Sequence, residues 1–228
     1  CFFILCLIVS THNVTQNITE EDKKYLNLFV KDVSIPQSAA SNLNFSNQLK
    51  LIKDIQSAII SQITFNGNGI EHNKPREPKN VFEYGKASCA DFSRVIEKTL
   101  MMVGFEIRHV ALYENESRKN VVSILTTKKV SSHASLEVLT KKGWMIVDSS
   151  NEWIAVSTEN IPYSMEKLQV TYSKQEKIEW ANPIIKTTEK FYDKPCVYVY
   201  GLYSRHGGFF RPYNFIPDFN MRQLLYNI

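Results

Sequence analysis

The chain has 228 residues, enough for one good-sized domain, and its 43% hydrophobic and 22% charged residues are ordinary for a globular protein. Its formal net charge is only +4 and no basic run stands out, which argues against a nucleic-acid-binding protein. The four cysteines, at positions 1, 6, 89 and 196, include no C-x-x-C pair, so neither a disulfide framework, a zinc ribbon nor a redox motif is indicated.

Residues 1–9 form an unbroken apolar run that is too short to span a bilayer as it stands. Such a run is typical of a signal peptide, or of the remaining half of an anchor whose start is missing, and a buried strand is the alternative. Residues 10–18 have the composition of a polar tether, so we expect residues 1–18 to pack on nothing in the single domain at 19–228. We therefore expect an extracytoplasmic protein, secreted, periplasmic or anchored through its N-terminus, with no other membrane contact.

Two helices are expected before the middle of the chain. A helix-start signature at Thr19 predicts a short helix over 19–30, and apolar residues at helical spacing predict a second helix over 46–63. The Asn-Gly repeats that follow end this helix. Pro75 and Pro78 then predict an extended stretch that leads to the next helix.

The stretch 88–104 has the pattern of one amphipathic helix with a cysteine in its first turn. Ser88 can serve as the N-cap, with Asp91 as the reciprocal half of a capping box, and Gly104 can end the helix in a left-handed conformation. The apolar stripe consists of Phe92, Val95, Ile96, Thr99, Leu100 and Val103. Cys89 would then lie where the free N–H groups and the helix dipole favour thiolate over thiol.

Four strands are expected after this helix, at 105–113, 121–127, 132–139 and 144–148. The last two are separated by a Gly-containing turn, and an antiparallel pair would bring Asp148 beside His133. Glu137 shares the face of His133 and is interpreted as a solvent-facing residue or a structural partner. One helix followed by several neighbouring strands favours an α+β fold over alternating βαβ units.

The C-terminal part divides into two stretches. Residues 164–192 are predicted to form short helices interrupted at Pro183, and residues 191–228 hold eleven aromatic side chains. These aromatics either complete the core or line a groove for a sugar or an extended peptide. In the second interpretation Arg205 and His206, beside two glycines, would place polar groups at the groove, and His206 is a candidate substrate-binding residue.

A set of residues in fixed order resembles the core of the transglutaminase-like superfamily over about residues 80–150. They are Gly85, Cys89, Phe92, Gly104, Phe105, His133, Glu137, Val138, Gly143, Trp144, Val147 and Asp148. The resemblance implies a papain-like α+β fold in which the helix that bears the cysteine packs on an antiparallel sheet, with N-terminal helices and an aromatic-rich C-terminal extension. One position departs from the pattern, because Ser135 stands where many members have an aromatic residue two positions after the histidine.

The resemblance also implies a Cys-His-Asp triad that performs acyl transfer or amide hydrolysis without a cofactor. Cys89 would attack an amide carbonyl, His133 would hold its proton and return it to the leaving amine, and Asp148 would orient the imidazole. The Cys89 N–H would contribute to the oxyanion hole, with Tyr84 as the candidate second donor and therefore a candidate substrate-binding residue. The substrate would be a peptide, a protein or a glycan-linked amide, and protease or amidase, transglutaminase and deglycosylase reactions all stay open.

Two other interpretations of the same residues remain. The chain could be a non-catalytic transglutaminase-like module that binds or scaffolds, for example within cell-envelope polysaccharide machinery, with Cys89 as an inert buried thiol. Alternatively Cys89, His133 and Asp148 could hold zinc, but their spacing fits no metal motif.

Overall fold

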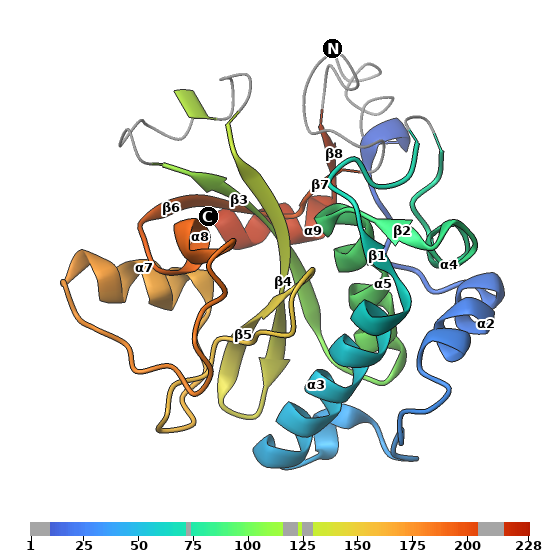
Figure 1. Ribbon diagram of the computed structural model, residues 1–228, viewed down its shortest axis with the longest axis horizontal. Helices are drawn as coiled ribbons and strands as arrows, with labels where there is room; N and C mark the ends of the chain where they lie inside the picture. Colours follow the sequence, from blue (N-terminus) through green and yellow to red (C-terminus); the bar gives the residue numbers. More distant parts are fainter. Residues whose placement is uncertain (1–9, 72–73, 116–122, 125–129, 205–216) are drawn as a thin grey trace.

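An antiparallel sheet lies at the centre of the computed structural model, which describes residues 10–71, 74–115, 123–124, 130–204 and 217–228 (Figure 1). Its strands are β3 (Ile107–Glu114), β4 (Ser132–Thr140), β5 (Gly143–Asp148) and β6 (Cys196–Tyr200), in the spatial order β5-β4-β3-β6. A tight hairpin joins β4 to β5, and β6 pairs antiparallel with β3 although more than 80 residues separate them. The sheet is therefore completed by the C-terminal part of the chain.

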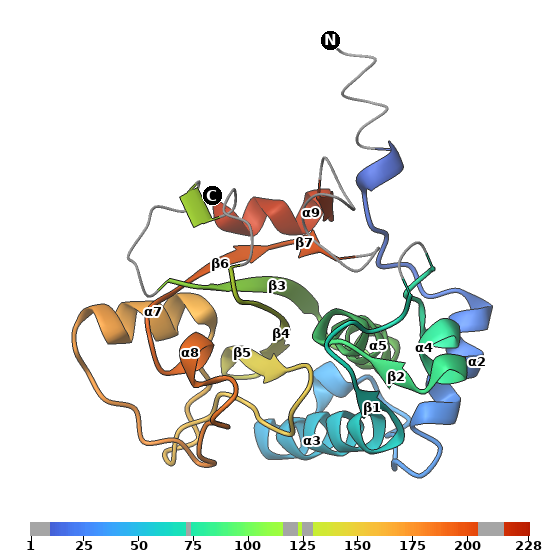
Figure 2. The ribbon, with the colours of Figure 1, turned by 45° about the horizontal axis from the view of Figure 1, so that its top comes forward.

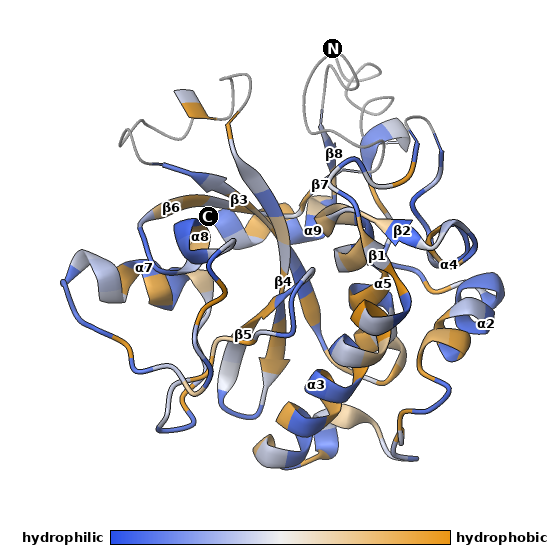
Figure 3. Ribbon diagram, viewed as in Figure 1, coloured by the Kyte–Doolittle hydropathy of each residue, from blue (hydrophilic) through white to orange (hydrophobic). Residues whose placement is uncertain are grey.

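Helices cover the two faces of this sheet (Figures 1 and 2). The first group is α2 (Glu20–Phe29), α3 (Phe45–Gln62), α4 (Pro78–Tyr84) and α5 (Cys89–Met102), and the second is α7 (Met165–Ser173) and α8 (Glu189–Tyr192). Figure 3 shows hydrophobic and hydrophilic residues alternating along α3, as expected of a helix with one exposed face. The remaining short elements are η1 (Ala40–Asn42), β1 (Thr64–Phe65), β2 (Lys86–Ala87), β7 (Leu202–Tyr203), β8 (Asp218–Phe219), α9 (Met221–Leu224) and η2 (Leu225–Asn227).

The side chains of β5 show how the sheet serves two cores. Met145 and Val147 belong to a cluster with α3 and α5, whereas Ile146 belongs to a second cluster with α7, α8 and Trp153. Successive side chains of a strand point to opposite faces, so both faces of β5 are buried. The sheet thus lies between two helical layers and is buried on both faces at β5.

The predicted α+β fold is confirmed, and the helix that bears the cysteine is close to its predicted bounds. Ser88 and Asp91 form the expected capping box at the start of α5. Gly104 follows the helix with φ of 98°, a left-handed conformation that favours glycine. The helix predicted over 46–63 is α3.

Two local predictions differ from the structure. The stretch before Cys89 is the helix α4, which begins at Pro78, because proline at the first helical position needs no N–H partner and has a suitable φ. Of the strand predicted at 121–127, only residues 123–124 are described, and they are helical. The rest of that prediction lies outside the described residues.

The described part of the N-terminal segment packs on the domain, contrary to the prediction. The Val14 N–H donates to the Phe219 carbonyl (2.7 Å), Asn220 Nδ2 donates to the Val14 carbonyl (2.8 Å), and Arg94 Nη2 donates to the Thr15 carbonyl (2.8 Å). Backbone groups of Val14 and Thr15 thus form hydrogen bonds with the C-terminal part and with α5. Residues 1–9 lie outside the described residues, and within the described part no helix has the length and apolarity needed to cross a membrane.

Glu137 is fully buried, so the prediction of a solvent-facing side chain is wrong and that of a structural partner is right. Its carboxylate accepts from the guanidinium of Arg108 and from the Tyr200 hydroxyl. The Arg108 guanidinium also lies 4.3 Å from the Trp144 ring centroid and 4.0 Å from that of Tyr200. This cluster joins all four strands of the sheet.

We expect removal of residues 191–228 to abolish the cooperative thermal unfolding transition. The deletion removes β6 and the buried side chains of Phe191 and Tyr192, so it exposes β3 and opens the core on the α7 face. Circular dichroism during heating measures this, with removal of the exposed Ile228 alone as the control. A truncated chain that still melts cooperatively would contradict the prediction.

Candidate active site

Cys89 is the first residue of α5, and a buried network fixes that end of the helix. The Asp91 carboxylate accepts from the Ser88 backbone N–H and from the Ser88 hydroxyl, both at 2.8 Å. The same carboxylate pairs with the buried guanidinium of Arg76, which also donates to the Ile70 carbonyl. The position of the Cys89 backbone is therefore set by contacts from α5 and from the segment before α4.

His133 and Asp148 meet across the hairpin of β4 and β5. His133 Nε2 lies 2.9 Å from Asp148 Oδ2, while Asp148 Oδ1 accepts from the backbone N–H groups of Ser150 (2.9 Å) and Asn151 (2.8 Å). Because the ionised carboxylate only accepts, Nε2 carries the proton that it shares with Asp148. The Nδ1 side of the ring is thereby left for Cys89.

The loop after β5 is held from the helical layer. Gln56, on α3, directs its Nε2 at the carbonyls of Asp148 (2.7 Å), Asn151 (2.9 Å) and Trp153 (3.1 Å). Buried carbonyls need such a donor, and this one comes from a helix nearly a hundred residues away in sequence. Gln56 therefore positions the backbone that presents Asp148.

Burial and mutual contacts set the protonation states of the three side chains. Burial raises the pKa of the Cys89 thiol, but the hydrogen bond and charge of His133, with the Ala134 backbone N–H, outweigh it and leave the pKa below its usual value. Burial lowers the pKa of His133, yet the charge and hydrogen bond of Asp148, with help from Cys89, raise it to about 10. Burial raises the pKa of Asp148, and the contacts from His133, Tyr192 and Asn151 bring it below its usual value. These directions favour a thiolate–imidazolium pair.

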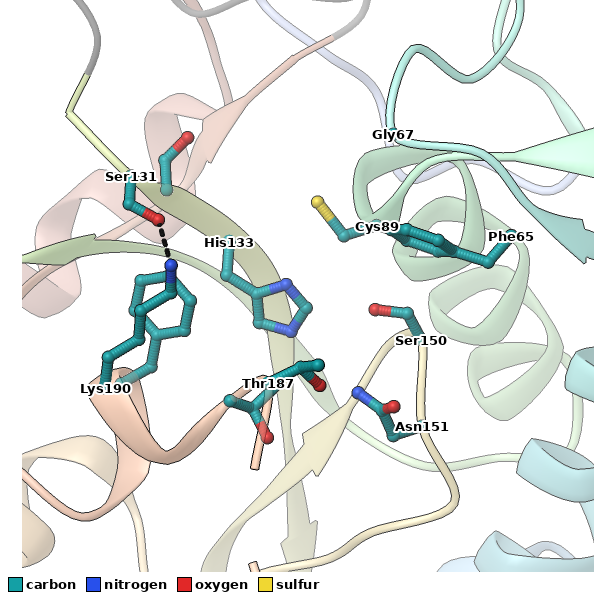
Figure 4. A pocket seen from close by; sticks show the side chains of 12 residues that line it. Phe65, Gly67, Cys89, Ser131, His133, Ser150, Asn151, Thr187 and Lys190 are labelled. Atoms are coloured by element: carbon teal, nitrogen blue, oxygen red, sulfur yellow. Dashed lines mark hydrogen bonds between the residues drawn. The ribbon is translucent and has the colours of Figure 1, made fainter. Parts of the chain in front are cut away.

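A cavity of about 440 Å³ opens beside this pair (Figure 4). Its lining comes from five segments of the chain: Phe65 and Gly67, Cys89, residues 131–133, residues 150–151, and residues 187–188 with 190–191. Both Cys89 and His133 face this space, so a ligand within it can reach the sulfur. Its surface is more apolar than polar, with two phenylalanine rings, one from β1 and one from α8, beside hydroxyl, amide and charged groups.

Two aromatic residues of α8 pack against the imidazole and were not singled out as site residues from the sequence. The Phe191 ring stacks on His133 with centroids 5.5 Å apart, and the Tyr192 ring meets His133 edge-on at 6.2 Å. The Tyr192 hydroxyl donates to Ser135 Oγ at 2.9 Å. The small side chain at Ser135, which departs from the superfamily pattern, therefore leaves room for an aromatic ring from elsewhere. The aromatic density of the C-terminal part was the one sequence signal that could have indicated this.

The two candidate binding residues have different outcomes. Tyr84 is 44% exposed at the end of α4 and is not among the described residues that line the cavity, so its binding role stays a prediction. His206 lies outside the described residues. Within the part of the chain that the structure describes, no group of three or more His, Cys, Asp or Glu side chains is placed to hold a metal ion.

Comparison with known families adds a finding that the geometry alone does not give. Residues 37–149 match the model of the transglutaminase-like superfamily. The chain carries a transglutaminase-like domain. The match extends the resemblance seen in the sequence, over about 80–150, back through α3, and it ends directly after Asp148. The α7 and α8 region lies beyond it.

Solved structures with a similar fold have low identity to this chain. They include a candidate cysteine protease from Cytophaga hutchinsonii (12% identity, 64% of this chain and 42% of that chain, TM-score 0.38) and a protein named TGase (16%, 66% and 37%, 0.39). A candidate protease from Parabacteroides distasonis shares 11% identity over 57% of this chain and 23% of that one, with a TM-score of 0.37. This chain thus spans less than half of each of these proteins. Comparison with curated proteins gives no match.

We expect Cys89 to be alkylated readily by iodoacetamide at pH 6, because its pKa is lowered and the thiolate is the reacting species. His133→Ala should slow the reaction by about tenfold or more, since the imidazolium stabilises the thiolate by about 1.4 kcal/mol or more. Cys196 is the internal control, because burial raises the pKa of its thiol to about 12. Peptide mass spectrometry of each cysteine measures both rates, and equal rates at comparable accessibility would contradict the prediction.

The pH dependence should separate the thiol from the imidazole. Alkylation of Cys89 should rise with pH through a midpoint below the usual thiol pKa and then stay flat, because only the thiolate fraction matters. Turnover of an amide also needs the His133 proton for the leaving amine, so it should fall again as pH rises toward about 10. Parallel rate–pH profiles of alkylation and turnover test this, and a turnover that decreases already near pH 6.5 would show an unshifted histidine.

Proposed function

We propose that the chain is a cysteine-dependent enzyme that hydrolyses an amide or transfers its acyl group through Cys89, His133 and Asp148. The observation that supports this most is the hydrogen bond from His133 to a buried Asp148 beside the free thiol of Cys89, which opens on a cavity. The transglutaminase-like domain supports a cysteine-enzyme type of fold. A buried thiol without these neighbours would be inert.

The proposed reaction has two stages. The Cys89 thiolate attacks the amide carbonyl, and the backbone N–H at the start of α5 stabilises the oxyanion because the first helical N–H groups lack intrahelical partners. His133 gives its Nδ1 proton to the leaving amine, which forms a thioester on Cys89. Water or a second amine then attacks the thioester, with His133 as the base, and the thiolate is restored. Asp148 keeps the imidazole oriented through both stages.

The decisive experiment traps the thioester. The full chain is mixed with a pool of amides that contains peptide bonds, glutamine side chains and glycan-linked amides, quenched in acid and measured by intact mass. We expect an added mass on Cys89 that hydroxylamine removes and that Cys89→Ala abolishes, with the fold retained in that variant.

The same experiment distinguishes the two outcomes of the thioester. An added primary amine should shorten the lifetime of the adduct and appear in the product if the enzyme transfers acyl groups, and should have no effect if it hydrolyses them. If no substrate in the pool forms an adduct and Cys89 also reacts no faster than Cys196 at pH 6, the function is contradicted and the non-catalytic binding module takes its place.

We also propose that the protein acts outside the cytoplasm. The apolar run at residues 1–9 supports this, because it is typical of an export signal. A fusion of residues 1–30 to alkaline phosphatase, which is active only after export, tests the proposal. Phosphatase activity that does not depend on residues 1–9 would contradict it.

A further inference from the structure

The cavity has one positive charge that the thiolate–imidazolium pair does not balance. Among the described residues that line it there is no carboxylate side chain, and His133 is paired with Cys89, so Lys190 is the further basic group. The other polar lining groups are hydroxyls and one amide. Such a space attracts an anionic group and repels a cationic one, because the walls exclude much of the water that would screen the charges.

Lys190 is held in place rather than free in solvent. Its Nζ donates to Ser131 Oγ at 2.6 Å and lies 5.3 Å from the centroid of the Phe191 ring, which stacks on His133. Its side chain is 37% exposed. In Figure 4, Ser131 and Lys190 lie on one side of His133 and Cys89 lies on the other. The ammonium is thus fixed on the wall of the space that opens on the sulfur.

The ion pair of Lys190 with Glu114 leaves room for a ligand. Nζ lies 3.6 Å from Glu114 Oε2, longer than the usual 2.7–2.9 Å of a charge-assisted hydrogen bond. An ammonium has three N–H donors, of which Ser131 takes one. Because Ser131 Oγ accepts that bond, its own O–H can donate to a ligand. Ser131 and Lys190 together offer two neighbouring donors, which matches the two oxygens of a carboxylate.

We propose that Lys190, with Ser131, is a specificity-determining site that selects acyl donors carrying a carboxylate near the amide that Cys89 attacks. This inference rests on the proposed function, since it assumes that the substrate enters the cavity beside Cys89. Lys190 belongs to α8, outside the stretch that matches the superfamily. The proposed site determines which substrate enters the cavity and does not alter the reaction of the thiol.

The alternative is that Lys190 only holds α8 to β3 through Glu114. The two roles make different predictions for the charge preference of the cavity.

This preference can be measured with methanethiosulfonates, because they modify any accessible thiol. Three reagents are used that differ only in their tails: sulfonatoethyl (anionic), trimethylammonioethyl (cationic) and hydroxyethyl (uncharged). Rate constants for Cys89 are taken by peptide mass spectrometry at low salt and divided by those for 2-mercaptoethanol under the same conditions.

We expect the anionic reagent to be favoured over the cationic one in the unmodified chain. Lys190→Gln should lower the ratio of the anionic to the cationic normalised rate by about fivefold or more, and should change the rate of the uncharged reagent little. This is the effect expected of a single charge within a few ångströms of the path by which the reagent approaches the sulfur. Lys190→Arg, which keeps the charge, should preserve the ratio. About 0.5 M salt should reduce the preference, because it screens the charge.

Two further variants make the test independent of the stability of α8. Glu114→Gln should raise the ratio, since it removes the opposing charge and keeps Lys190. Lys142→Gln is the matched control, because its Nζ likewise lies over a ring, that of Phe45 at 4.7 Å, and donates to the Asn160 carbonyl at the far end of the hairpin. It makes the same change in net charge and should leave the ratio unchanged.

An unchanged ratio in Lys190→Gln, or the same decrease in Lys142→Gln, would overturn the proposal. Its failure differs from failure of the proposed function, since the ratio is measured whether or not Cys89 is activated. A final comparison uses paired amides that differ only by a carboxylate or a carboxamide beside the scissile bond. The carboxylate member should form the Cys89 adduct faster, and Lys190→Gln should remove this advantage.

Discussion

The candidate site depends on charges that stabilise one another where burial opposes each of them. Burial raises the pKa of Cys89 and Asp148 and lowers that of His133, so it disfavours the charged form of each group. The contacts among the three, with smaller contributions from Ala134, Tyr192 and Asn151, reverse these directions. The ion pair therefore exists only while the helix start and the hairpin are held at contact distance, and the rest of the fold can be understood as what maintains that distance.

Two buried polar networks provide this positioning from opposite sides. Asp91, paired with Arg76, fixes the start of α5, and Gln56 of α3 fixes the loop that presents Asp148. Neither side chain touches the sulfur or the imidazole according to the hydrogen bonds of the described residues. Because buried polar groups are costly to leave unsatisfied, both networks favour a single arrangement of the backbone around the site. The positions of Cys89 and Asp148 thus depend on side chains that have a structural role.

The sequence predicted those parts of the site whose signals are local. The periodicity and cap of α5, and the alternation of β4 and β5, lie within short windows, so Cys89 and the fold class could be predicted. The helix α4 was missed because proline was interpreted as a breaker, although it starts a helix here. The packing of Val14, the burial of Glu137 and the contacts of α8 depend on partners far along the chain, which no local pattern reports. The roles of Tyr84 and His206 stay predictions.

The boundary of the superfamily match divides the site by role. Residues 37–149 include the thiol, the imidazole and the carboxylate, whereas Thr187, Lys190 and Phe191, which line the cavity beside His133, lie beyond the match. The reacting groups are constrained by each other's charge, so a change in one would neutralise the others. The wall from α8 is under no such constraint, since it contacts the imidazole by ring packing and carries a charge that another residue can balance. Under the proposed function, chains that share the domain are therefore expected to keep the Cys-His-Asp arrangement and to differ in substrate through the segment that follows Asp148.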